Sequence, residues 1–186
     1  LIYIVAYASP DFSITQIGNL ASLRIGIKNA SKEQSENVLE ASALLSGAHI
    51  HHKIADNIIA AIWRKYILNC AYNITTARYN RTIGQLREDS ETAAQYETLV
   101  RESWLVSEAA GAGVPETSIN EIIDQFYHKL DPASTSSLQR DIWAGRPSEL
   151  ETFSGYLVRK AKELSVPVPL SETMYSDLKE IVSKQS

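Results

Sequence analysis

A lysine and two asparagines recur four residues apart inside an apolar stretch of the chain. The stretch WRKYILNCAYN (63–73) carries Lys65, Asn69 and Asn73. Successive helical residues turn by about 100°, so these three drift by only about 40° per step and share one side over two turns. A buried amide without a hydrogen-bond partner costs about 1–3 kcal/mol. This polar stripe of Lys65, Asn69 and Asn73 must therefore contact other polar groups. A lysine supplies charge and a proton, and amides suit the hydroxyl, carbonyl and carboxylate groups of a small ligand.

The spacing leaves a second interpretation of this stripe open. It could face solvent or pair with another helix, and Arg64 and Arg78 could extend such a wet face. The apolar residues around it instead predict a helix that is buried on most of its circumference. These residues are Ile58, Ile59, Ile62, Trp63, Ile67, Leu68, Ala71 and Tyr72.

A second group of polar residues lies in TSSLQRDIWAGRPSELE (135–151). Ser136 and Ser137 stand at a predicted helix start, where backbone N–H groups point outward and favour a carboxylate. Glu149 comes twelve residues after Ser137, at the start of another predicted helix. Local pattern favours capping for that region, with Ser148 as N-cap and Glu149 as a first-turn acid.

The elements that must position these residues change in kind near residue 56. The first part predicts a strand at 1–8, turn chemistry at 9–12, a hairpin turning at Gly18-Asn19, and a short strand at 48–55. Between them, Ser31 and Gln34 predict a capping box at the start of a helix that ends near Gly47. Asp56 is the expected cap of a long helix over 57–79.

Helical periodicity dominates the rest of the chain. Helices are predicted at 89–111, 116–129, 136–145, 148–164 and 171–184. About 50 strand-rich residues are therefore followed by about 130 helical ones, which predicts two domains or an α+β unit.

Composition and motif spacing argue against several classes of protein and of binding site. The 186 residues are 44% hydrophobic with a net charge of −4, which argues against a nucleic-acid surface. Cys70 is the one cysteine, so no intrachain disulfide forms, and a reducing compartment such as the cytoplasm is expected. Charged or amide residues interrupt every apolar run, so no membrane span is expected. We predict no metal at HIHH (49–52), because no carboxylate or cysteine stands at a ligand spacing.

Taken together, these motifs resemble the ketopantoate reductase (2-dehydropantoate 2-reductase) family. The resemblance spans residues 57–186, and the order and spacing of its motifs agree. Further family-like segments are GYLVRKA (155–161) and VPVP (166–169). The matching positions are Trp63, Lys65, Asn69, Asn73, Ser136, Ser137, Asp141, Gly145, Arg146 and Glu149.

The resemblance implies a two-domain architecture. An N-terminal Rossmann domain would bind NADPH, and an all-helical C-terminal domain, like that of 6-phosphogluconate dehydrogenase, would close over the substrate. Residues 1–53 would be the last strands and helix of the Rossmann domain, and residues 54–186 the helical domain. The sequence contains no G-x-G-x-x-G and opens inside a strand-like run. We therefore expect a fragment of a longer protein that is inactive alone.

The resemblance also implies roles for the site residues. Lys65 would be the general acid that protonates the ketone oxygen of the 2-oxo acid. Asn69 and Asn73 would hold the substrate's oxygens, and Ser137 its carboxylate. Glu149 would contact the substrate hydroxyl or the nicotinamide ribose of the cofactor.

Three departures from the family pattern put the substrate in question. Ile74 follows the second asparagine where proline is common, and Leu138 follows the serine pair where methionine is usual. Ile83 precedes Gly84 where the family has a further substrate-binding asparagine nearby; here Asn80 is the nearest amide. A related reductase of another 2-oxo acid or of an imine is the first alternative. A non-catalytic helical dimerisation module is the second, and the apolar helices leave room for a homodimer.

Overall fold

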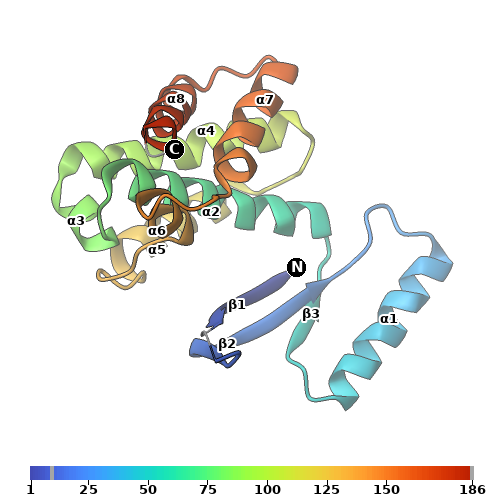
Figure 1. Cartoon of the computed structure of the whole chain (residues 1–186). Coiled ribbons are helices and arrows are strands. Elements are labelled where there is room, and N and C mark those ends of the chain that lie inside the picture. The colour runs from blue at the N-terminus through green and yellow to red at the C-terminus, as the bar shows by residue number, and fades with distance from the viewer. Residues whose placement is uncertain (9–10, 185–186) are drawn as a thin grey trace. The chain divides into compact units, whose positions relative to one another are not determined.

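The structure is a computed structural model that describes residues 1–8 and 11–184. The chain divides into two compact units, Leu1–Ile62 and Trp63–Ser186. The elements, labelled in Figure 1, are β1 (Ile2–Ala8), β2 (Ile14–Ile25), α1 (Lys32–Gly47), β3 (His52–Ile54), α2 (Ile58–Tyr79), α3 (Ile83–Glu88), α4 (Ser90–Ala109), α5 (Glu116–His128), α6 (Ser137–Trp143), the π-helical segment η1 (Glu151–Gly155), α7 (Tyr156–Glu163) and α8 (Pro169–Ser183). The predicted fold class, strands followed by a mostly helical region, is confirmed.

The first unit holds a three-stranded sheet in the order β1-β2-β3. Strand β1 pairs antiparallel with β2, and β2 pairs parallel with β3 after the crossover through α1. The predicted hairpin turn at Gly18-Asn19 is wrong, because β2 runs through it without a break. The ladder instead shifts register there, with residues 17–20 of β2 opposite residue 5. The glycine therefore marks a bulge in a long strand.

The chain reverses between β1 and β2, in the predicted turn at 9–12. Residues 9–10 of that turn lie outside the described residues. Beyond them, Asp11 Oδ1 accepts hydrogen bonds from Ser13 N (3.2 Å) and Ser13 Oγ (2.8 Å). This short Asx-type turn directly precedes β2.

The observed N-cap agrees with the predicted one at α1 and lies one residue later at α2. The capping box of α1 is confirmed: Ser31 Oγ accepts from Gln34 N, and Ser31 N donates to Gln34 Oε1. Helix α2 begins at Ile58, so its N-cap is Asn57, whose Oδ1 accepts from Ala60 N at 3.1 Å. The predicted cap at Asp56 is wrong, because that residue lies one position too early.

The histidines of segment 49–52 pair with serines. His51 Nδ1 lies 2.9 Å from Ser22 Oγ, and His52 Nε2 lies 2.7 Å from Ser42 Oγ. Over the described ranges, no three His, Cys, Asp or Glu side chains form a group that could hold a metal ion.

The helices of the second unit pack around a core that spans α2 to α8. Tyr96 of α4 stacks on Phe126 of α5, with ring centroids 3.9 Å apart. Val106, Leu157 and Val168 form a further buried cluster that joins α4, α7 and the start of α8. Within the described part of the chain, no helix is long and apolar enough to cross a membrane.

Helix α3 is missing from the sequence prediction. It has six residues, too few to show a helical period, and it begins at a Thr82–Gln85 capping box. Gly84 lies against the segment that leads to α6: its N donates to Pro132 O at 2.8 Å, and a Cβ there would meet Pro132 O at 3.0 Å. This close approach requires a glycine.

A buried carboxylate holds the start of α8. Glu102 of α4 is 6% exposed, and it accepts hydrogen bonds from Leu170 N (3.0 Å), Ser171 N (2.8 Å) and Ser171 Oγ (2.6 Å). The first N–H groups of a helix have no partner within the helix, so a negative charge there satisfies them.

Replacing Glu102 with alanine should destabilise the chain by about 2 kcal/mol, because buried donors at the start of α8 lose a charged acceptor. Urea denaturation followed by circular dichroism measures the change. Glu108→Ala is the matched control, since Glu108 lies exposed on the same helix. Equal effects of the two substitutions would contradict this role of Glu102.

Candidate active site

Helix α2 carries the predicted polar stripe on one side. Asn73 is 6% exposed and Asn69 is half-buried. The side-chain Nδ2 of Asn73 donates to the backbone carbonyl of Asn69 at 2.9 Å, one turn earlier on the helix. With about 100° per residue, one sector of about 160° holds, in angular order, Tyr72, Lys65, Thr76, Asn69, Asn73, Tyr66 and Cys70.

Helix α6 is hydrogen-bonded to the C-terminal half of α2. At its start, Thr76 Oγ1 lies 2.7 Å from Ser136 Oγ, with both side chains buried, and Tyr72 OH donates to Thr135 O (3.1 Å). At its end, Trp143 Nε1 donates to Ala77 O (2.8 Å). In Figure 1, α6 accordingly lies beside α2. The start of α6 is therefore held next to the last turn of the stripe.

The two serines at the start of α6 have different positions. Ser136 is the N-cap, and its Oγ accepts from Gln139 N at 3.0 Å. Ser137 is the first helical residue and is exposed. The predicted helix start is confirmed. The hydroxyl of Ser137 is accessible to a ligand, whereas that of Ser136 is used in capping the helix.

A compact turn joins α6 to the π-helical segment. Gly145 has φ +64°, a conformation that favours glycine, and its N–H bonds back to Ile142 O. Arg146 forms an ion pair with Asp141 (2.8 Å) and its backbone N also donates to Asp141 O (2.9 Å). Asp141, Gly145 and Arg146, which match the family pattern, therefore stabilise this turn.

Glu149 lies at the end of the same turn and is exposed. The helical backbone begins at Leu150, and Glu149 O accepts from Thr152 N (3.0 Å) and Phe153 N (3.1 Å). The predicted Ser148 N-cap is wrong, because Ser148 lies one residue too early. Glu149 itself precedes the first helical residue.

The π-helical segment η1 is bound to α2 through its carbonyl groups. Tyr66 OH donates to Thr152 O and Phe153 O, both at 3.0 Å, and the Cys70 thiol donates to Phe153 O at 3.2 Å. A π-helical turn disturbs the ordinary backbone pairing, and such turns recur at functional sites. Tyr66 and Cys70 thus fix the segment that begins two residues after Glu149.

Burial governs the titration of these two groups. It raises the pKa of the Tyr66 hydroxyl far above its ordinary value, and it raises the pKa of the Cys70 thiol to about 12. Both groups therefore remain protonated donors at neutral pH.

These contacts place the stripe between two docked segments. The start of α6 contacts Tyr72, at one flank of the stripe, and Thr76, beyond its last turn. The η1 segment contacts Tyr66 and Cys70 at the other flank. The structure thus brings the segments that bear Ser137 and Glu149 against the helix that bears the lysine and two asparagines. The docking role of these four residues was not predicted from the sequence, although their spacing, 66/70 and 72/76, repeats the four-residue period of the stripe.

The three departures from the family pattern all lie in the core. Ile74 and Ile83 are fully buried, and Leu138 is 1% exposed. Ile74 also points to the side of α2 opposite Lys65. Asn80 directly follows α2 with φ +49°, and its Oδ1 accepts from Gln139 Nε2 (3.0 Å). Ile74, Ile83 and Leu138 therefore pack in the core and present no group to a ligand, and Asn80 joins the end of α2 to α6.

Comparison with known proteins supplies the family. The model for the C-terminal domain of ketopantoate reductase (PanE/ApbA) matches residues 57–182, more than half of the chain. The chain belongs to the ketopantoate reductase family. The match covers the stripe, the start of α6 and Glu149.

Curated relatives agree with this membership. A 2-dehydropantoate 2-reductase of Caulobacter vibrioides is 30% identical over 128 residues, which are 69% of this chain and 43% of that protein. An uncharacterized oxidoreductase, YkpB, of Bacillus subtilis is 27% identical over 85% of this chain and 52% of its own length. The chain thus spans about half the length of the relatives it matches.

Solved structures show the same fold. A dimeric ketopantoate reductase from Staphylococcus aureus matches with a TM-score of 0.84 at 22% identity, over all of this chain and 61% of that one. The ternary structure of D-mandelate dehydrogenase with NADH and anilino(oxo)acetate matches with a TM-score of 0.82 at 18% identity, over 99% of this chain and 59% of that one.

Cys70 should resist alkylation in the folded chain. Its thiol is buried and its raised pKa of about 12 leaves almost no thiolate at pH 8.5. The raised pKa also means that the folded chain binds more protons than the unfolded chain above pH 9, so Cys70 makes stability fall between about pH 9 and 12. Iodoacetamide labelling followed by mass spectrometry should be slow in buffer and fast in urea. Labelling at the free-cysteine rate in buffer would refute the placement of Cys70.

Proposed function

We propose that this chain forms the substrate-binding and proton-donating part of an NADPH-dependent 2-dehydropantoate 2-reductase. The proposal rests on one observation: the Lys65, Asn69 and Asn73 face of α2 lies between the docking points of the two segments that bear Ser137 and Glu149. Reduction of ketopantoate to pantoate would serve pantothenate and coenzyme A synthesis.

Lys65 is the proposed general acid. A reduced nicotinamide held by a nucleotide-binding domain would supply the hydride to the carbonyl carbon of the 2-oxo acid. Negative charge then builds on the carbonyl oxygen, and the Lys65 ammonium neutralises it by donating a proton, which gives the 2-hydroxy acid. An ammonium beside this oxygen lowers the barrier because the charge develops only in the transition state.

The remaining polar side chains orient the substrate in this proposal. Asn69 and Asn73 hold its oxygen atoms, and the exposed Ser137 hydroxyl binds its carboxylate. Glu149 accepts a hydrogen bond from the substrate hydroxyl or from the nicotinamide ribose. Together they would hold the ketone oxygen near Lys65, so that the proton passes between two groups that are already in position.

The residues present do not form a phosphate site for the dinucleotide. No G-x-G-x-x-G occurs in the 186 residues. We propose that residues 1–53 are the last part of a Rossmann domain and residues 54–186 the substrate domain. In support, none of the side chains that the structure describes in residues 1–54 is buried.

A reductase of another 2-oxo acid is the second candidate. The solved D-mandelate dehydrogenase structures with NADH share the fold, so the substrate class and the choice between NADH and NADPH are both open to assay. The ratio of kcat/KM values for ketopantoate and other 2-oxo acids separates the two candidates. A homodimer is also proposed, as in the dimeric Staphylococcus aureus relative.

Lys65→Ala should lower kcat by roughly 10²–10⁴-fold in a reductase that joins this chain to a nucleotide-binding domain, because the proton donor is lost. Lys162→Ala is the control, since Lys162 is exposed on α7. Circular dichroism verifies that both variants fold. If the module served only for dimerisation, Lys65→Ala would alter the association state and leave kcat unchanged.

The 186-residue chain alone should show no NADPH-dependent turnover of ketopantoate. The reason is the missing glycine-rich phosphate loop, without which the cofactor is not held against the substrate. Absorbance at 340 nm measures the reaction, with a full-length relative as the positive control. Appreciable turnover by the chain would refute the proposed division of roles.

A further inference from the structure

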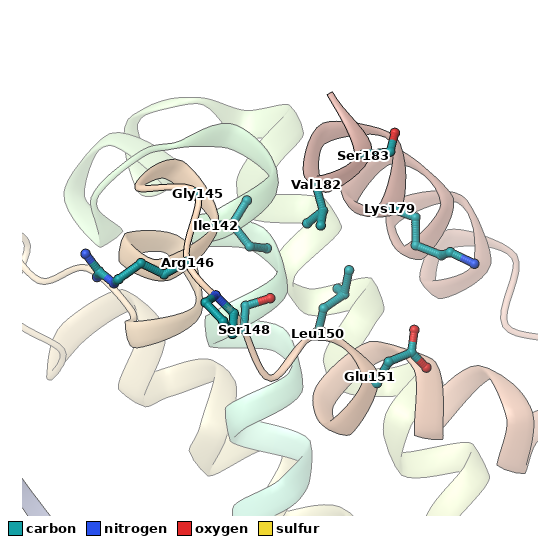
Figure 2. A pocket seen from close by; sticks show the side chains of 10 residues that line it. Ile142, Gly145, Arg146, Ser148, Leu150, Glu151, Lys179, Val182 and Ser183 are labelled. Atoms are coloured by element: carbon teal, nitrogen blue, oxygen red, sulfur yellow. The ribbon is translucent and has the colours of Figure 1, made fainter. Parts of the chain in front are cut away.

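The second unit contains a cavity that the proposed reaction does not use. It has a volume of about 560 Å³ and lies between the turn after α6, the start of η1 and the last turns of α8 (Figure 2). This volume is in the range of small-molecule sites, about 300–1,000 Å³. Ser148, Leu150 and Glu151 line it, whereas Glu149 between them does not.

The floor of the cavity is aliphatic. Ile142, Leu150 and Val182 come from three separate segments and converge on the hollow in Figure 2. Ile142 and Leu150 are almost fully buried, so the floor is fixed by the core. An apolar chain placed here would be removed from water at a gain of about 25 cal/mol per Å².

The rim of the cavity carries an ammonium group. Lys179 lines the cavity one turn before Val182, and its Nζ lies 5.4 Å from the centre of the Tyr175 ring. Among the described residues, no carboxylate oxygen lies within 4.0 Å of this Nζ. The ring contact leaves N–H groups of the ammonium able to bind an anion.

The one acid of the lining is already neutralised. Glu151 Oε2 lies 2.6 Å from Arg159 Nη1, and Glu151 Oε1 accepts from Tyr175 OH at 2.5 Å. These bonds, with that of Tyr175 first, lower the pKa of the Glu151 carboxyl. Arg146 at the other end of the cavity is paired with Asp141. The charge of Lys179 also lowers the pKa of the Glu151 carboxyl, and with both pairs neutral Lys179 leaves the lining with an excess positive charge.

We propose that this cavity binds a small amphipathic carboxylate, with its aliphatic chain on Ile142, Leu150 and Val182 and its carboxylate at Lys179. The hydroxyl of Ser148, which also lines the cavity, supplies a further donor, whereas that of Ser183 already donates to Glu180 O. The ligand contacts both neighbours of Glu149 in the chain. This site is distinct from the Lys65 stripe and does not depend on the proposed reductase activity.

Octanoate is the probe, with octylammonium and 1-octanol as matched ligands of opposite and zero charge. Titration of the ¹⁵N-labelled chain should give saturable amide shifts confined to residues 142–151 and 179–183. Octanol should bind more weakly, and octylammonium should give no saturable shifts. Lys65→Ala should bind octanoate unchanged, so failure of the reductase proposal would not affect this result.

Two substitutions on α8 test the anchor. Lys179→Gln should weaken octanoate binding about threefold, as expected for a partly exposed ion pair, and leave octanol binding unchanged. Lys184→Gln is the control, because Lys184 is exposed on the next turn and paired with Glu180. The proposal is overturned if octanoate shifts fall elsewhere, if octylammonium binds equally well, or if both lysine variants bind octanoate like the parent chain.

Discussion

Two buried hydroxyls, those of Thr76 and Ser136, hold the candidate site together. Their oxygens lie 2.7 Å apart, Thr76 Oγ1 lies 2.7 Å from Tyr72 O, and Ser136 Oγ accepts from Gln139 N. Each hydroxyl carries one proton, so the chain is complete when Ser136 donates to Thr76 and Thr76 donates to Tyr72 O. A buried hydroxyl without its partner costs about 1–3 kcal/mol, so α2 and α6 have one favourable register. That register holds the start of α6, which bears Ser137, against the last turn of α2.

The π-helical segment η1 adds the second constraint. Tyr66 and Cys70 donate to carbonyl groups of Thr152 and Phe153, which ties η1 to the opposite flank of the stripe. At Gly155 of the same segment, a Cβ would meet only the ends of the Glu151 and Arg159 side chains, which can move aside. One face of α2 therefore organises two segments that are 60 to 90 residues away in sequence, and the polar stripe lies between them.

Periodicity predicted which residues share one face of a helix, but few of the contacts between helices. The grouping of Lys65, Asn69 and Asn73 follows from 100° per residue, and the start of α6 follows from serine at an N-cap. The division of roles between Ser136 and Ser137 depends on Thr76, 60 residues earlier, which no local pattern contains. The π-helical turn and the bulge at Gly18-Asn19 likewise depend on partners elsewhere in the fold, so the sequence misassigned both.

The most direct test of this account is a double-mutant cycle between Thr76→Val and Ser136→Ala, read out as free energies of unfolding in urea. If the hydroxyl pair joins α2 to α6, the two losses should be non-additive, with a coupling energy of about 1 kcal/mol or more. Losses that add within about 0.3 kcal/mol would contradict it, because the hydroxyls would then contribute independently and the register of the site would be set by other contacts.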